Sequence, residues 1–253
     1  MKKQPTSVIY MAIFTLIVMI FSSCVFINIG SENSGGDTIQ ASGDRETYEF
    51  NVGEFNKIRI EGTCEVRYYN GNSNAVTLLI QPNVREYFSI EAVNGELIVK
   101  TTRRITYGPP NKGPLLTIYA PALNQVTIDG AGIFTANDKI TTDSLTLNIN
   151  GATSGKAELD VNNLTVIMSG AGDLELSGRA DISNITLSGA GNYNALLLVS
   201  RDATVNMAGV GYAGVNSSDL LNINANGAGS VEYKGSPSLN LNTSGMIGIR
   251  KVN

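Results

Sequence analysis

Apolar and polar residues alternate in short runs from about residue 120 onward, and each run ends at a glycine turn. Side chains alternate across a β-strand, so such a run presents one apolar and one polar face. The first glycines of the turns recur every 18 to 21 residues, each four residues after an aliphatic side chain. These pairs are Val126 with Gly130, Leu147 with Gly151, Val166 with Gly170, Ile185 with Gly189, Val205 with Gly209, Ile223 with Gly227 and Leu241 with Gly245. A strand-like repeat of this length predicts a solenoid, whose coils close their core only against their neighbours.

Stacking like residues on like residues predicts an all-β fold, a parallel β-helix with coils of about 20 residues. A right-handed coil is expected, because crossover connections between parallel strands are right-handed. The alternative, a β-propeller, needs blades of about 40 residues, twice this period. The glycines are expected at bends, where a narrow corner or a positive φ excludes a β-carbon.

The first half of the folded part carries the same alternation less regularly. Residues 57–69 already follow it, with Ile58, Ile60 and Val66 on one face. Further strands are predicted at residues 75–81, 88–92, 96–101 and 115–119, with a hairpin turn at Asn94-Gly95 and a loop at residues 107–114. We therefore expect one β-helical domain over residues 47–253, with a distorted or mixed sheet that caps one end.

The N-terminus resembles a bacterial export signal. Lys2 and Lys3 precede an uncharged, mostly apolar run over residues 8–21, and small residues then lead to Cys24. This arrangement resembles the lipobox of bacterial lipoproteins, in which the cysteine takes the lipid and becomes the mature N-terminus.

That resemblance implies a signal peptide over residues 1–23 and a lipidated Cys24. Residues 30–44 are rich in Ser, Gly, Asn and Asp, so a flexible tether is expected over residues 24–46. The alternative is an uncleaved anchor, because residues 8–29 are long enough to cross a bilayer. Either way, the membrane is an expected partner and the domain lies in the cell envelope. Whether the outer membrane holds it on the periplasmic or the surface side stays open.

Composition excludes several classes of chemistry. The net charge is −4, and without residues 1–23 it is −6, from 16 basic and 22 acidic residues, so nucleic acid is not an expected partner. There is no histidine, which excludes a Ser-His-Asp triad and histidine-ligated metal. With Cys24 lipidated, Cys64 stands alone and is expected to be buried. We expect no metal and no cofactor.

The repeated Gly-Ala-Gly phrases, the opening segment Phe55–Gly62, the strand Glu96–Val99 and the lipoprotein signal together resemble a known family. It is the head GIN domain family of auto-transporter adhesins, common among exported lipoproteins of Bacteroidetes, and the resemblance covers about residues 48–250. It implies a right-handed β-helical domain at the cell surface or in the periplasm, with an adhesive role. It brings no catalytic motif, so no catalytic residue is predicted.

An enzyme on the same fold is the alternative, because parallel β-helices often carry polysaccharide lyases or hydrolases. Such sites need carboxylates that converge on one outer face. The candidates are Asp129, Asp173 and Glu175. Acidic residues do not recur at matching offsets on neighbouring coils, which favours solvated surface charge over a catalytic group.

The binding hypothesis concerns the polar face of the strands that precede the glycines. Stacked amides suit sugar hydroxyls, because each offers a donor and an acceptor. The predicted binding residues are Asn148, Asn150, Asn206, Asn224, Asn226 and Asn242. The alternative is that this ladder only stabilises the coils through hydrogen bonds between its own members. The sequence thus favours a non-enzymatic adhesion or scaffold domain that binds a glycan or a surface protein, with a purely structural envelope protein as a further alternative.

Overall fold

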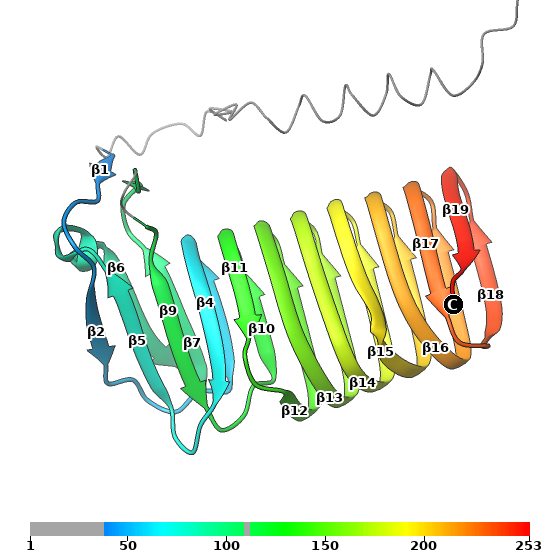
Figure 1. Ribbon diagram of the computed structural model, residues 1–253, viewed down its shortest axis with the longest axis horizontal. Helices are drawn as coiled ribbons and strands as arrows, with labels where there is room; N and C mark the ends of the chain where they lie inside the picture. Colours follow the sequence, from blue (N-terminus) through cyan, green and yellow to red (C-terminus); the bar gives the residue numbers. More distant parts are fainter. Residues whose placement is uncertain (1–37, 109–111) are drawn as a thin grey trace, which may run out of the picture. The chain divides into compact units, whose positions relative to one another are not determined.

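A computed structural model describes residues 38–108 and 112–253. These residues are nearly all β, with 72% in strands and 3% in helix, and they form a β-solenoid of about 7 turns with coils of about 19 residues. Figure 1 shows the coils stacked side by side along one axis. The parallel β-helix predicted from the repeats is therefore confirmed. The signal peptide and Cys24 lie outside the described residues.

The described chain contains 19 strands and one 3₁₀ helix, η1 (Pro82–Tyr87). The strands before the regular coils are β1 (Ile39–Gln40), β2 (Glu46–Phe50), β3 (Lys57–Glu61), β4 (Thr63–Asn70), β5 (Ala75–Ile80), β6 (Phe88–Val93), β7 (Glu96–Thr101), β8 (Ile105–Thr106) and β9 (Leu115–Ala120). The coils comprise β10 (Gln125–Ile128), β11 (Ala131–Ala136), β12 (Ile140–Ile149), β13 (Ala152–Met168), β14 (Ala171–Leu187), β15 (Ala190–Met207), β16 (Val210–Ala225), β17 (Ala228–Lys234), β18 (Ser238–Thr243) and β19 (Met246–Lys251).

Each coil contributes to two sheets that face one another across the core. Sheet I contains the segments before the glycines, in the order β6-β7-β3-β10-β12-β13-β14-β15-β16-β18. Sheet II contains the segments after the glycines, in the order β2-β5-β9-β4-β11-β13-β14-β15-β16-β17-β19. Strands β13 to β16 bend around the second corner and so belong to both sheets.

The aliphatic column predicted from the repeats lies in one continuous parallel register. Val166 pairs with Leu147 on one side and with Ile185 on the other, and all three side chains are buried. Burying one such side chain stabilises the fold by about 1.5–3 kcal/mol. The column ends at Leu241, which is 52% exposed because the described chain places no further coil on it.

The first glycine of each turn is required by a close approach of two backbones. A β-carbon on Gly170 would lie only 1.9 Å from the carbonyl oxygen of Gly151 in the preceding coil. The next residue, Ala171, donates its backbone N–H to that same oxygen at 3.0 Å. The second glycine differs, because Gly172 also has a φ of 154°. Of the two expected causes, the narrow corner therefore explains Gly170, and both apply to Gly172.

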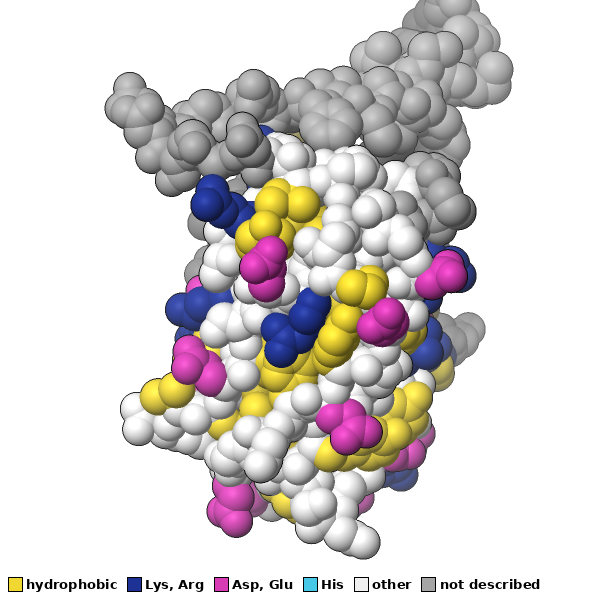
Figure 2. Space-filling view, turned by 90° about the vertical axis from the view of Figure 1, so that its left-hand side faces the viewer, with side chains coloured by type: hydrophobic (Ala, Val, Ile, Leu, Met, Phe, Trp, Pro, Cys, Tyr) yellow, Lys and Arg dark blue, Asp and Glu magenta, His cyan; other side chains and the backbone are white. Residues whose placement is uncertain are grey.

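Antiparallel strands close the N-terminal end of the solenoid, which we call the cap end. Strand β5 pairs antiparallel with β2 and β9, and β6 with β7, which confirms the expected mixed sheet. The predicted hairpin turn is present, with φ of 52° at Asn94 and 77° at Gly95. Helix η1 buries Val84 beneath this end. Figure 2 looks onto the cap end, where basic and acidic side chains stand among hydrophobic ones.

The order of the coils in space differs from their order in the sequence. Strands β3 and β4 lie between β7 and β9 on one side and β10 and β11 on the other, and all four pairings are parallel. The chain therefore builds the coil at residues 57–70 first, runs outward to form the cap, and then returns past that coil. The non-repetitive residues 71–120 provide this excursion.

The end of the predicted tether is attached to the cap end. Ile39 and Gln40 pair in parallel with Ile105 and Thr106 of the neighbouring loop, as β1 and β8. The side chain of Asn83 accepts a hydrogen bond from the Ser42 backbone at 3.0 Å and donates one to the Gln40 carbonyl at 2.9 Å. Residues 39–42, which the prediction assigned to the flexible tether over residues 24–46, are therefore joined to the domain. The chain enters the domain at the cap end (Figure 1).

The corner contact leads to a stability prediction. We expect Gly170→Ala to lower the free energy of unfolding by about 1–3 kcal/mol, because the added methyl group must push two coils apart. Gly53→Ala is the matched control, since a β-carbon there would meet no atom within 4 Å. Urea unfolding of both variants checks this; equal midpoints would contradict the close approach.

Candidate functional site

The six predicted asparagines lie on the outer face of sheet I, in two columns. One column runs Thr127, Asn148, Ile167, Thr186, Asn206, Asn224 and Asn242 from coil to coil. Asn150 and Asn226 belong to the second column, one residue before the corner glycine. Ile167 and Thr186 interrupt the first column, so the asparagines form one group around Asn148 and another from Asn206 onward.

Much of the hydrogen-bonding capacity of this ladder is used within the ladder. Asn148 donates its side-chain amide to the Thr127 hydroxyl at 3.3 Å, and Asn224 donates to the Asn206 amide oxygen at 3.0 Å. Asn150 donates to Asp129 at 2.7 Å. Each of these bonds joins one coil to the next. The geometry therefore supports the stabilising role of the ladder and leaves fewer amide donors for a ligand.

The three candidate acids do not form one cluster. Asp129 lies at the end of a sheet I segment, where it also accepts a bond from the Arg59 guanidinium at 2.7 Å. Asp173 and Glu175 lie on the outer face of sheet II, two coils further along and beyond the glycine corner. Each of the three is paired with a neighbouring side chain rather than with another carboxylate.

A groove of about 450 Å³ crosses the coils on the outer face of sheet II. Its volume lies within the range of small-molecule sites. The side chains that shape it are Ile133, Lys156, Asp173, Glu175, Asn192 and Tyr212. They come from five successive strands, β11 and β13 to β16, so the groove runs across the strands.

Two side-chain pairs line the groove. Asn192 donates its amide to an Asp173 carboxylate oxygen at 2.7 Å, and the Lys156 ammonium lies 3.3 Å from both carboxylate oxygens of Glu175. Each pair joins adjacent coils. The small Ser154 stands in the column between Ile133 and Asp173 and leaves the space that the groove occupies.

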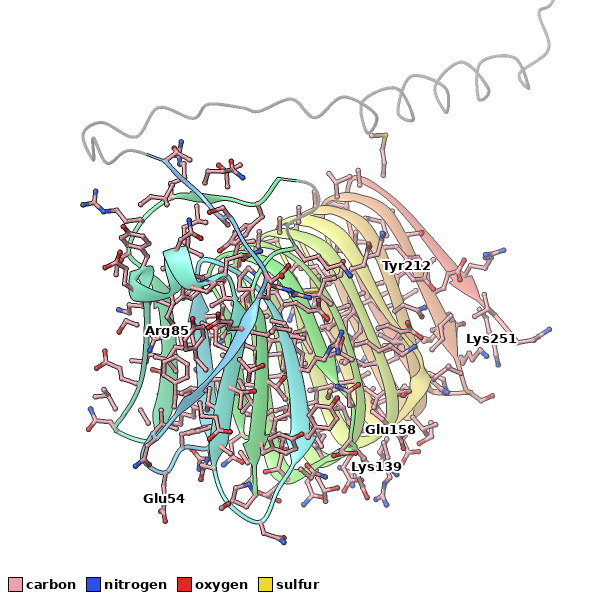
Figure 3. All side chains as sticks on the ribbon, turned by 60° about the vertical axis from the view of Figure 1, so that its left-hand side comes forward. Glu54, Arg85, Lys139, Glu158, Tyr212 and Lys251 are labelled. Carbon is pink, nitrogen blue, oxygen red and sulfur yellow. The ribbon has the colours of Figure 1, made fainter. Side chains whose placement is uncertain are left out.

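Tyr212, on β16, lines the end of the groove that lies nearest the C-terminal end of the solenoid. Figure 3 labels this residue. A β-carbon on Gly214 would lie 2.5 Å from the Tyr212 hydroxyl, so this glycine makes room for the ring. The hydroxyl donates to the Glu232 carboxylate at 3.3 Å, and Glu232 also binds the Arg250 guanidinium. Partial burial and the Glu232 charge raise the pKa of Tyr212, while the hydrogen bond from Arg250 lowers the pKa of Glu232. The tyrosine is therefore a neutral donor held by a charged acceptor.

The groove presents donors, acceptors and apolar surface together. The amide and carboxylate of Asn192 and Asp173 can bond adjacent hydroxyls. The Tyr212 ring offers a face for stacking, and Ile133, which is 49% exposed, adds an apolar wall. Asp173 and Glu175 are candidates from the sequence alone, but the sequence does not predict a groove, because the groove depends on the small Ser154 and Gly214.

Two buried groups do not belong to this surface. Cys64 is 4% exposed, as expected, and burial raises the pKa of its thiol to about 12. Tyr193 lies wholly inside the core. Within residues 38–108 and 112–253, no three His, Cys, Asp or Glu side chains are placed to hold a metal ion. The same described ranges contain no helix that is long and apolar enough to span a bilayer.

A stacked β-solenoid with a grooved polar flank is typical of proteins that present an extended surface to other molecules. The model of the family described as "Putative auto-transporter adhesin, head GIN domain" matches residues 54–237. The chain belongs to this family. Membership indicates a cell-surface or envelope location and an adhesion-like role.

Solved structures share the fold. One from Bacteroides fragilis, described as a "putative adhesin", is 25% identical, has a TM-score of 0.79, and is covered over 100% of its length by 85% of this chain. A "putative adhesin" from Parabacteroides merdae is 20% identical with a TM-score of 0.64, over 86% of this chain and 100% of that one. A "putative lipid binding protein" from Parabacteroides distasonis, 18% identical with a TM-score of 0.66, has the same coverage and shows the fold alone. No curated protein matches the sequence.

The burial of Cys64 leads to a reactivity prediction. In the Cys24→Ala variant, we expect a thiol-specific disulfide reagent near pH 8 to modify no cysteine while the protein is folded. The reason is that the thiolate is the reactive form and this thiol is both buried and protonated. Unfolding in guanidinium is the control and should release one reactive thiol. Rapid modification of the folded variant would contradict the placement of Cys64.

Proposed function

We propose that this protein is a lipid-anchored, non-enzymatic adhesion domain of the cell envelope, which binds glycans through the groove on sheet II. The observation that carries the proposal is the groove itself. It combines the Asn192–Asp173 pair, the Tyr212 ring and a rigid sheet in one place. Family membership supports the adhesive role, and the hydroxyl-binding chemistry of the lining supports the ligand class.

The groove is a better binding site than the asparagine ladder of sheet I. Asparagine amides are bonded from coil to coil on both surfaces, Asn148 and Asn224 in the ladder and Asn192 in the groove, so this bonding does not distinguish the two. The difference is that the ladder has no aromatic ring on its outer columns. Sugars bind best where polar groups lie beside an aromatic or apolar surface, and the groove offers both through Tyr212 and Ile133.

The carbohydrate-active enzyme is disfavoured by how the groove acids are paired. Glycosidases need one carboxyl group that donates a proton and a second that acts as base or nucleophile. Here the Lys156 ammonium contacts Glu175 and the Asn192 amide contacts Asp173. Each acid is thus paired with a basic or amide side chain of an adjacent coil, and neither is paired with a second carboxyl group among the described residues.

The groove hypothesis is tested by a glycan array with the purified full chain. For any glycan that binds, we expect Asn192→Ala and Tyr212→Ala each to weaken affinity about 5- to 150-fold, because each removes a hydrogen-bonding or stacking group worth about 1–3 kcal/mol. Asn224→Ala on sheet I is the matched control and should leave affinity unchanged.

The outcomes of the array separate the alternatives. Loss of binding in Asn224→Ala, with Asn192→Ala unaffected, would place the site on the ladder instead. Silence of the unmodified chain on all glycans and on host surface proteins would contradict adhesion. Release of shortened or unsaturated sugars from a bound polysaccharide would favour the enzyme.

The anchor is tested separately. We expect Cys24→Ala to abolish incorporation of a labelled fatty acid, because the thiol is the acceptor of the lipid. The variant should also accumulate with its signal peptide uncleaved. Cys64→Ala is the control and should incorporate label normally. Unchanged labelling of Cys24→Ala would exclude the lipoprotein assignment and favour the uncleaved anchor.

A further inference from the structure

The C-terminal end of the solenoid, formed by β18 and β19, is an open sheet end. Among the described residues β18 pairs only with β16, and β19 only with β17. One edge of each strand is therefore left with backbone donors and acceptors that no other strand takes. Figure 1 shows both strands at the end opposite the cap.

Hydrophobic side chains are exposed along this open end. Leu239 and Leu241 of β18, which continue buried columns of the coils before, are 39% and 52% exposed. Met246 takes the position that alanine holds in most other coils, and it is 80% exposed. The core of the solenoid is therefore accessible to a partner at this end.

Strand β18 carries none of the features that prevent pairing at an edge. Soluble proteins protect exposed edges with charged side chains, especially lysine, and with proline, bulges or inward-pointing charge. Strand β18 reads Ser-Leu-Asn-Leu-Asn-Thr and β19 reads Met-Ile-Gly-Ile-Arg-Lys. Strand β18 alternates cleanly and is uncharged. Strand β19 alternates less regularly, and its two charges, Arg250 and Lys251, stand together at its C-terminal end. Such an edge favours a partner strand with the same alternation.

The cap end offers a different kind of edge. Its outermost strands, β2 and β6, each pair with one described strand, β5 and β7, in antiparallel fashion, and the Arg85 guanidinium lies 4.6 Å from the centre of the Phe50 ring of β2. Arg85 and Lys251 mark the two ends in Figure 3. Because the two ends are unlike, stacking of open end on cap end would not continue the pattern of the coils.

We propose that two copies of this chain associate through their open ends, with β18 and β19 each pairing antiparallel with the same strand of the partner. A two-fold axis relates the copies, so the contact is self-complementary and closes as a dimer. Centred on Asn240, the β18 pairing sets Leu239 against the partner's Leu241.

The charges fit this arrangement. Centred on Gly248, the β19 pairing sets Arg250 against the partner's Met246 and keeps the two arginines apart. Like charges directly opposite one another would destabilise a cross-strand pair. Strand β18 contributes no charge, so the interface contains paired backbone groups and an apolar row, with Arg250 still held by Glu232.

Such a dimer has a geometric consequence that rests on the proposed lipid anchor. Each chain enters its domain at the cap end, through β1. Pairing of the open ends therefore sets the two points of entry at opposite extremes of the dimer. The anchored dimer would join two membranes rather than sit flat on one.

The association is tested with the full chain in detergent by analytical ultracentrifugation. We expect a concentration-dependent dimer, and a rise of about tenfold or more in its Kd in each of two variants. Leu241→Lys places a charge in the apolar row, and Met246→Lys sets a positive charge against the partner's Arg250. Leu197→Lys is the matched control, since Leu197 is 65% exposed on the flank of the solenoid. Unfolding midpoints confirm that all three variants are folded.

A cross-linking experiment tests the pairing itself. In a chain with Cys24→Ala, Asn240→Cys should form a disulfide-linked dimer on mild oxidation, because the two copies of this residue meet at the two-fold axis. Asn224→Cys, one coil away, should not. A monomer at all concentrations, a dimer unaffected by Leu241→Lys and Met246→Lys, or equal cross-linking of both cysteine variants would overturn the proposal.

The membrane geometry has its own readout. Vesicles carrying the lipidated chain should cluster, as measured by light scattering, and Leu241→Lys should abolish clustering while the protein still floats with the vesicles. Loss of flotation would contradict the anchor and not the dimer. Flotation without clustering, in a chain that dimerises in detergent, would overturn the bridging arrangement alone.

Discussion

The contact between backbones at the glycine corner fixes the register of the whole solenoid. In successive coils, Ala152 donates its N–H to Gly130, and Ala171 donates to Gly151, both at 3.0 Å. A side chain at the glycine would separate these partners, so the contact also selects the residue type. Because every corner repeats it, position four before the glycine is always inward, and the aliphatic column is a consequence of the corner as much as of hydrophobic burial.

The same register determines what each outer face can do. On sheet I, neighbouring coils bring amides and hydroxyls directly over one another, so the asparagines bond among themselves, as Asn224 does with Asn206. On sheet II, residues of different size and charge meet in the columns. Because Ser154 is small beside Asp173 and Gly214 has no side chain beside Tyr212, this face is uneven and contains a groove instead of a uniform ladder. The candidate site therefore depends on differences in side-chain size between successive coils on sheet II.

The regular coils could be predicted from the sequence because their contacts repeat at a constant separation. The Asn94-Gly95 turn was equally readable, since it is a local signal. The position of residues 57–70 between later strands was not, because it depends on pairings between segments that share no repeat. The groove could not be predicted from the sequence for a related reason. Ser154 and Gly214 are small residues that carry no distinctive motif, and their effect appears only once the coils are stacked.

The two ends of the solenoid show how differently a repeated structure can be terminated. At the cap end, about fifty residues outside the repeat pattern form antiparallel strand pairs. The sequence of this segment therefore lacks the regular spacing of the coils. At the other end, β18 keeps the alternation and the glycine of an interior coil, with Leu241 still in the aliphatic column and Gly245 at the corner. A coil with the sequence pattern of its interior neighbours is stabilised by contacts on both sides, since each coil buries its core against its neighbours. The last coil is therefore expected to gain stability when another surface packs against it.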